Sequence, residues 1–441
     1  MITSEHKNIA QWAMNFSIQH GCSSARVAIT VANNNSFEYR NTQLDKLQQS
    51  SENKLYIELF VDGRYGTLST NRLDKSELEV FIKEGISSTR FLAEDKFRQL
   101  PVSERYSKAS DLFDLNLEDK DFWKYSTEQK LSLAKQTVEE VYGTDSQIVS
   151  VVAAYDDGWG AEYMIASNGF EGEAQDTVFS LSAEVVLKTD GDVRPESYWY
   201  NNSLYWKDLE KQGIASKALE RVLQKLGQTK IKSGSYPMLL DNMVASRMLS
   251  PLIGAMYGSA IQQKNTFLLN KLHTQITSPL LTVTDNPHLK CTFGSRWFDG
   301  EGVATHKQCI IEKGVLNTYF IDTYNALKLD VAPTIASPSV LTFEKGTKSC
   351  TELMQSLTKG ILVTGFNGGN TNSTTGDFSF GIEGFLIENG IAIKSISEMN
   401  ITGNILDLWS NLVEVGNDPF SRYASRQVPS LLFDGVSFSG L

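Results

Sequence analysis

The second half of the chain is divided by short turn-forming sequences, and this pattern restricts its fold more than any other feature. The runs between these turns are short and rich in apolar and β-branched residues. The turn sequences are Asp299-Gly300, Lys313-Gly314, 367–370, 388–390 and Asp434-Gly435. Short strands joined by tight turns are typical of an antiparallel sheet that curls into a barrel. We therefore expect a β-rich C-terminal domain over residues 233–441.

The first half has a different texture, in which helical and strand-like periods alternate. Apolar residues recur with helical spacing at Ile9, Trp12, Ala13 and Phe16. Residues 55–61 and 65–70 flank Asp62-Gly63 as two strands flank a hairpin turn. Turn-forming composition at 33–35 and 156–158 predicts two further turns, and a long helix is expected over 204–226. The predicted fold class is α+β, with a mixed α/β N-terminal domain over residues 1–232.

The charge and hydropathy of the chain disfavour nucleic-acid and membrane partners. Lys and Arg number 41 against 52 Asp and Glu, which gives a formal net charge of −11. A net charge of this sign opposes binding to phosphate backbones and anionic lipids. The sequence contains no run of about 18 apolar residues, which is the length that a membrane-spanning helix requires. Polar residues interrupt every turn of the N-terminal helix, which does not resemble a signal peptide. We expect a cytoplasmic protein.

Neither the cysteines nor the histidines have the spacing of a metal site. The four cysteines, Cys22, Cys291, Cys309 and Cys350, contain no CxxC pair, so we expect reduced thiols. None of the five histidines lies in an HExxH or HxH pattern. Three of them, His273, His288 and His306, could converge only through the fold. The chain also lacks a GxxxxGK[ST] phosphate loop and a GxSxG nucleophile elbow. The residues alone identify no catalytic site.

Four ordered segments in the second half resemble the TldD/PmbA family, whose members have also been called modulators of DNA gyrase. The first two are FDGEGVATHKQCIIEKGVLNTYFIDTYNALKL, residues 298–329, and GILVTGFNGGNTNSTTGDFSFGIEGFLIENG, residues 360–390. The other two are MNITGNILDLWSNLVEVGND, residues 399–418, and PSLLFDGVSFSG, residues 429–440. Four matches in the right order are far more specific than one short motif. The resemblance implies the α+β architecture given above.

The resemblance also separates two branches of the family. The catalytic branch carries HExxxH on a helix and a late cysteine as zinc ligands. In this chain we expect the equivalent helix over 241–262, with Asp241 at the first His, Asn242 at the Glu and Ser246 at the last His. The last cysteine, Cys350, precedes the third matching segment. The chain therefore resembles the PmbA/TldE-like branch that lacks the zinc motif, and zinc is expected only in a partner subunit.

By this resemblance the chain is a non-catalytic partner subunit of a TldD/TldE-type zinc metallopeptidase that acts on unfolded or modified peptides. The expected partners are a zinc-bearing TldD-like sibling and, in its absence, a second copy of this chain. Asp377, Ser379 and Asn404 are candidates for binding peptide or for shaping the sheet. The alternative is a stand-alone homodimeric peptide-binding protein. A hydrolase using Asp377 with Ser379 is a weaker alternative, because a serine without a positioned histidine lacks a base.

Overall fold

The computed structural model describes the backbone of residues 1–441 and every side chain except that of Asp111. The chain divides into two compact units. The first contains Met1–Leu223 together with Arg296–Thr305, and the second contains Gln224–Ser295 and His306–Leu441. No helix in the described part of the chain combines the length and the apolar character that a membrane crossing requires.

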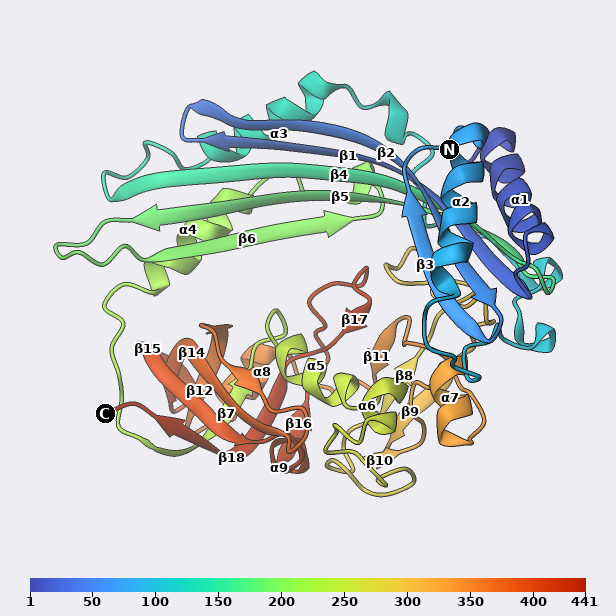
Figure 1. Ribbon diagram of the computed structural model, residues 1–441. Helices are drawn as coiled ribbons and strands as arrows, with labels where there is room; N and C mark the ends of the chain where they lie inside the picture. The colour runs from blue at the N-terminus through green and yellow to red at the C-terminus, as the bar shows by residue number, and fades with distance from the viewer. The chain divides into compact units, whose positions relative to one another are not determined.

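The first unit is built on one antiparallel sheet of six strands (Figure 1). The strands are long, and their order in the sheet is β3-β2-β1-β4-β5-β6. Their bounds are β1 Ser24–Arg40, β2 Gln43–Val61, β3 Arg64–Thr70, β4 Ile148–Ala166, β5 Glu171–Leu187 and β6 Glu196–Ser203. The predicted hairpin turn at Asp62-Gly63 is confirmed, since both residues have positive φ between β2 and β3.

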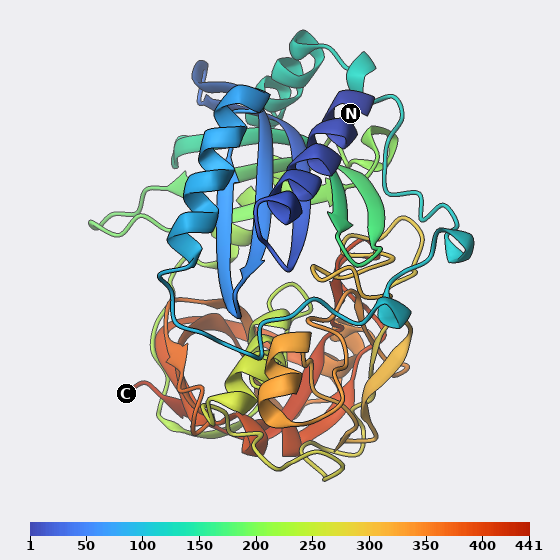
Figure 2. The ribbon, with the colours of Figure 1, turned by 45° about the vertical axis from the view of Figure 1, so that its right-hand side comes forward.

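Four α-helices belong to this part of the chain. They are α1 Ser4–Gln19, α2 Lys75–Thr89, α3 Thr127–Glu139 and α4 Ile214–Gln224. Thr3 and Ser126 begin α1 and α3 with reciprocal capping boxes, and Asp74 caps α2. Figure 2 shows α1 and α2 side by side on the sheet. The buried face of α1 contains Ile9, Ala13 and Phe16, as its spacing predicts.

Three sequence predictions for this unit are wrong. The residues at 33–35 and 156–158 form no turns, because β1 and β4 run straight through them and pair Asn34 with Gly158. The helix expected over 204–226 is shorter: η4 (Trp206–Asp208) is followed by α4, which begins only at Ile214. Gly213 has a φ of +77°, and the Glu140 carboxylate accepts hydrogen bonds from the N–H groups of Gly213 and Ala215. These contacts fix a helix start that local propensity does not specify.

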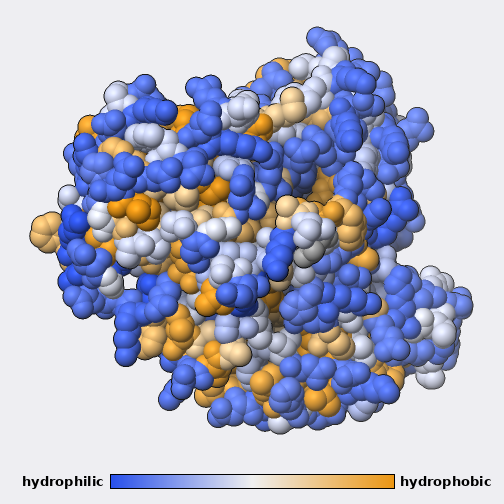
Figure 3. Space-filling model, turned by 90° about the vertical axis from the view of Figure 1, so that its right-hand side faces the viewer, coloured by the Kyte–Doolittle hydropathy of each residue, from blue (hydrophilic) through white to orange (hydrophobic). Residues whose placement is uncertain are grey.

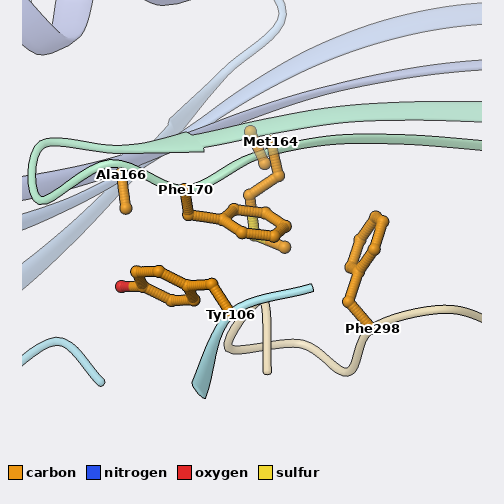
Figure 4. Packing of buried hydrophobic residues seen from close by; sticks show 6 residues of the cluster. Tyr106, Met164, Ala166, Phe170 and Phe298 are labelled. Carbon is orange, nitrogen blue, oxygen red and sulfur yellow. The ribbon is translucent and has the colours of Figure 1, made fainter. Parts of the chain in front are cut away.

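A short segment from the second half of the sequence completes the core of the first unit. Phe298 packs against Phe170, with ring centroids 5.2 Å apart, in a cluster that also contains Tyr106 and Met164 (Figure 4). Gly302 has a φ of +84°, and an added Cβ there would touch the Phe170 ring. The FDGEGV sequence at 298–303 therefore has a packing role in this unit. Three 3₁₀ turns, η1 Ser103–Arg105, η2 Ala109–Asp111 and η3 Phe122–Lys124, lie in the connection before α3.

The second unit contains the predicted barrel. Five strands close on themselves in the order β12-β7-β18-β15-β14 and back to β12, and only the β12–β7 pair is parallel. Their bounds are β7 Gly234–Leu240, β12 Lys359–Phe366, β14 Asp377–Glu388, β15 Ile391–Asn404 and β18 Leu431–Ser439. At the closing pair, a Cβ on Gly384 would overlap the Leu362 carbonyl oxygen. The absence of a side chain there allows the barrel to close.

Two predicted turn sequences of the second unit are turns, and a third is not. Asn389 and Gly390 have positive φ between β14 and β15, as do Lys313 and Gly314 between β9 and β10. Asp434-Gly435 forms a bulge within β18 and not a turn. Two further strands join the barrel sheet, β13 Asn370–Thr371 and β16 Leu412–Val415.

The remaining strands of the second unit form a smaller five-stranded sheet, accompanied by short helices. Its strands are β8 Val283–Asp285, β9 Gln308–Glu312, β10 Val315–Leu316, β11 Leu341–Phe343 and β17 Arg426–Gln427. The helices are α5 Ser246–Gly254, α6 Gly258–Gln262, α7 Thr323–Leu329, α8 Cys350–Gln355 and α9 Ile405–Ser410. The fold class is α+β with a barrel-like C-terminal sheet, as predicted. The face drawn in Figure 3 is largely hydrophilic, with apolar residues in small separate groups.

Candidate functional site

The residues aligned with the zinc motif do not share one helix. Asp241 follows β7, and its carboxylate accepts a hydrogen bond from the Met243 N–H at 2.9 Å. The Asp241 carbonyl accepts another from the Val244 N–H at 3.1 Å. These bonds form a turn, so the helix predicted over 241–262 is wrong: α5 begins at Ser246, and α6 begins anew at Gly258.

Asn242 ties this turn to a loop that is distant in sequence. Its side-chain amide donates to the Asp418 carbonyl oxygen at 2.5 Å. The Asp418 carboxylate in turn accepts from the Cys350 N–H at 2.8 Å. It also accepts from the N–H and hydroxyl groups of Ser430, both at 3.1 Å. The end of β7, the start of α8 and the start of β18 therefore meet at Asp418.

Sequence reasoning set Cys350 aside, yet the fold brings it to this cluster. Burial raises the pKa of the Cys350 thiol to about 11. A hydrogen bond with Ser430 lowers this pKa, and the negative charges of Asp241 and Asp418 raise it. Without a bound metal the thiol is protonated at neutral pH, and a protonated thiol is a poor nucleophile. No sequence motif contains Cys350, so its place in this cluster becomes visible only from the contact between distant segments.

We predict that Cys350 is alkylated slowly by iodoacetamide at pH 7.5, and that its rate rises about tenfold per pH unit up to about pH 11. Ser430→Ala should slow the reaction further, because the hydrogen bond that favours the thiolate is lost. Mass spectrometry of the labelled chain measures this rate, with the partly exposed Cys291 as an internal control. A fast reaction that levels off near pH 8 would contradict the assignment.

The donors at the family ligand positions do not fit zinc. The Asp241 carboxylate and the Asn242 amide already hold the turn and the Asp418 loop. Ser246 opens α5, and its carbonyl accepts from the Ser250 hydroxyl at 2.9 Å. Among the described residues, no three His, Cys, Asp or Glu side chains come close enough together to hold a metal ion. Burial lowers the pKa of His288, and a charge on the nearby His306 would lower it further. In the part of the chain that the structure describes, no third donor joins these two histidines in a metal site.

Asp377 and Asn404 are brought together, whereas Ser379 is not part of their contact. The two residues pair across β14 and β15, and the Asn404 amide donates to the Asp377 carboxylate at 3.0 Å. Hydrogen bonds from Thr375 and Asn404 hold the pKa of Asp377 below its usual value. Asn404 also caps α9 through the Leu406 N–H. Ser379 is exposed, and its cross-strand neighbours, Asn370 and Thr402, are not general bases.

Comparison with known proteins places the chain in one family. The PmbA/TldA metallopeptidase C-terminal domain matches residues 233–440, and the central domain of the same family matches residues 120–226. Metalloprotease PmbA of Escherichia coli O157:H7 is 27% identical over 420 residues, which are 94% of this chain and 92% of that protein.

Solved structures agree with this placement. A Bacteroides thetaiotaomicron protein named "putative modulator of DNA gyrase" has 54% sequence identity and a TM-score of 0.98, over 100% of both chains. TldE from Thermococcus kodakarensis has a TM-score of 0.85 over 99% of this chain and 100% of that chain. At 19% identity that likeness shows a shared fold. The family's two domains match residues 120–226 and 233–440, and the structural likeness extends over the whole chain. The chain therefore belongs to the PmbA/TldD metallopeptidase family.

Proposed function

We propose that this chain is a metal-free, non-catalytic subunit of a two-subunit zinc metallopeptidase that acts on unfolded or modified peptides. The observation that carries the proposal is the turn at Asp241 and Asn242, whose side chains bind their own chain at the family ligand positions. A zinc-bearing sibling of the TldD type would supply the metal. The role of this chain is then to stabilise the sibling and to complete the space that receives the peptide.

The chemistry at these positions supports the same conclusion. Zinc in a peptidase lowers the pKa of a bound water and polarises the scissile carbonyl. An adjacent carboxylate takes the proton from that water. Asn242 has a carboxamide where this base would be, and an amide does not take up a proton near neutral pH.

We predict that the purified chain, after dialysis, holds well under one equivalent of zinc. Elemental analysis measures this directly, and a zinc-bearing sibling purified in the same way provides the positive control. The midpoint of thermal unfolding should also be the same with and without a chelator, because removal of a bound metal would destabilise the fold. One tightly bound zinc per chain would refute the proposal.

The alternative is a stand-alone homodimer that binds peptides without any role in proteolysis. Both proposals expect a two-fold dimer of the isolated 49.1 kDa chain, because two-fold pairing is the commonest assembly of soluble proteins. They differ when the sibling is added. Light scattering of the mixture should show an assembly containing both chains if this chain is a partner subunit. A homodimer that ignores the sibling would favour the alternative.

A further inference from the structure

The outer half of β2 is an open sheet edge. β3 pairs with β2 only from Leu55 to Val61. From Gln43 to Lys54, β2 pairs with β1 on one side, and no described strand pairs with its other side. Almost every residue of this stretch is exposed. At about 3.4 Å per residue the open edge is about 40 Å long and presents a row of free backbone N–H and C=O groups.

The centre of this edge lacks the features that usually prevent pairing with another strand, whereas its two ends carry the charged residues Asp45, Lys46, Glu52 and Lys54. Natural edges are protected by prolines, clustered charges, bulges or a covering element. The stretch reads QLDKLQQSSENK, which contains no proline and has only uncharged residues from Leu47 to Ser51. The one register shift with β1 lies opposite Glu38 and Tyr39, near the hairpin end. The centre of the edge is therefore regular and unprotected.

A cavity of about 410 Å³ borders the centre of the edge. Gln49, Ser50 and Ser51 of β2 line it on one side, with Asn33 and Asn35 of β1. The remaining wall is made by residues around η3 and α3, namely Phe122, Trp123, Tyr125, Thr127 and Lys130. Three aromatic rings thus face a polar floor, and Trp123 is 55% exposed. Such a mixture suits an apolar side chain attached to a polar backbone.

The cavity is held in place by polar contacts, which range from a buried ion pair at its wall to an exposed hydrogen bond at its floor. Lys130 forms an ion pair with Asp157 at 2.6 Å, and the Lys130 ammonium lies 5.2 Å from the Phe122 ring centroid. The Asn35 amide donates to Asp157 at 2.7 Å, and the Gln49 amide donates to Asn35 at 2.9 Å. The cavity is therefore pre-formed, and binding would not have to order its walls.

We propose that the open edge of β2 binds one extended peptide by strand addition, with an apolar side chain of that peptide in the cavity. The proposal rests on the peptide-handling role proposed above and gives that role a location in the first unit. Backbone hydrogen bonds supply affinity without strict sequence choice, and the cavity adds a preference at one position. A second copy of β2 is a poorer occupant. If two copies paired edge to edge at the cavity, residues 48–51 of the second copy would lie next to the cavity, and none of these four residues is apolar.

The test uses the full chain and a fluorescein-labelled, unstructured peptide of about twelve residues with a central leucine. Its comparison peptide is methylated on the four central backbone nitrogens, which removes donors but retains the side chains. We expect the methylated peptide to bind about 4- to 100-fold more weakly, because two of the four N–H groups of an added strand point towards β2 and each backbone hydrogen bond contributes about two- to tenfold. Trp123→Ala should weaken binding of the unmethylated peptide about tenfold. Tyr198→Ala is the matched control, because Tyr198 is also 55% exposed but lies on β6.

Hydrogen exchange locates the bound peptide on the same full-length protein. We expect slower exchange of the amides of residues 43–54 when peptide is added. Equal affinity for both peptides, or no binding of either, would overturn the edge site. Slowed exchange only in the barrel strands would also overturn it, while the partner-subunit proposal would still be judged by metal content and assembly. Slowed exchange at 43–54 that depends on protein concentration without peptide would make a second copy the occupant.

Discussion

Replacement of Asp157 by alanine is expected to destabilise the first unit by about 3–5 kcal/mol, because it leaves the buried ammonium of Lys130 without its partner. The Lys130 and Asp157 side chains are only 6% and 0% exposed. Asp157 also accepts a hydrogen bond from the Tyr155 hydroxyl at 2.6 Å. Burial and the charge of Asp157 raise the pKa of Tyr155, so this hydroxyl remains a donor. The variant would leave several polar groups unsatisfied at once.

Urea unfolding followed through the exchange of β4 amides measures this loss in the first unit. Asp121→Ala is the matched control, because the side chains of its ion pair with Lys124 are 55% and 75% exposed, and an ion pair so screened by water contributes little to stability. The double variant Lys130→Met with Asp157→Asn should recover part of the loss, since no buried charge remains unpaired. A loss below about 1 kcal/mol for Asp157→Ala would show that this pair is hydrated in solution.

The same residues show where the sequence misled the secondary-structure prediction. Asn33–Asn35 and Asp156–Gly158 have the composition of turns, but they pair with one another in the middle of two long strands. The side chains of Asn33, Asn35 and Asp157 face a buried lysine or a cavity, and these surroundings include residues of α3, which is distant from both segments in sequence. Local propensity yields to such tertiary contacts. Asp62-Gly63 and Asn389-Gly390, whose role depends only on their own φ angles, were predicted correctly.

The barrel and the candidate site differ in the same way. The sequence indicates the barrel through short apolar runs and turn sequences, of which Asn389-Gly390 joins two barrel strands, β14 and β15. The site depends on Asp418, which joins Asn242, Cys350 and Ser430 from separate segments. Spacing in the sequence cannot predict that meeting. The spacing also does not predict that the helix aligned with the zinc motif begins only at Ser246. The hydrogen bond from the Met243 N–H to the Asp241 carboxylate forms a turn ahead of this helix.

The largest functional effect is expected when this chain is mixed with a zinc-bearing sibling. The mixture should cleave an unstructured protein such as casein, whereas neither chain should do so alone. Asp241→Asn in this chain should leave that cleavage unchanged, because asparagine retains an acceptor for the Met243 N–H and carries no catalytic role here. Replacing the glutamate of HExxxH in the sibling should abolish cleavage, because that carboxylate is the general base. Loss of cleavage from the Asp241 variant alone would assign chemistry to this chain.

Casein cleavage by each chain alone and by their equimolar mixture, with and without a zinc chelator, tests the central claim most directly. The account predicts cleavage only in the mixture, its loss on chelation, and its return when zinc is added back. Cleavage of casein by the isolated chain in the presence of chelator would contradict the account, because it would require a metal-independent catalytic site in this chain.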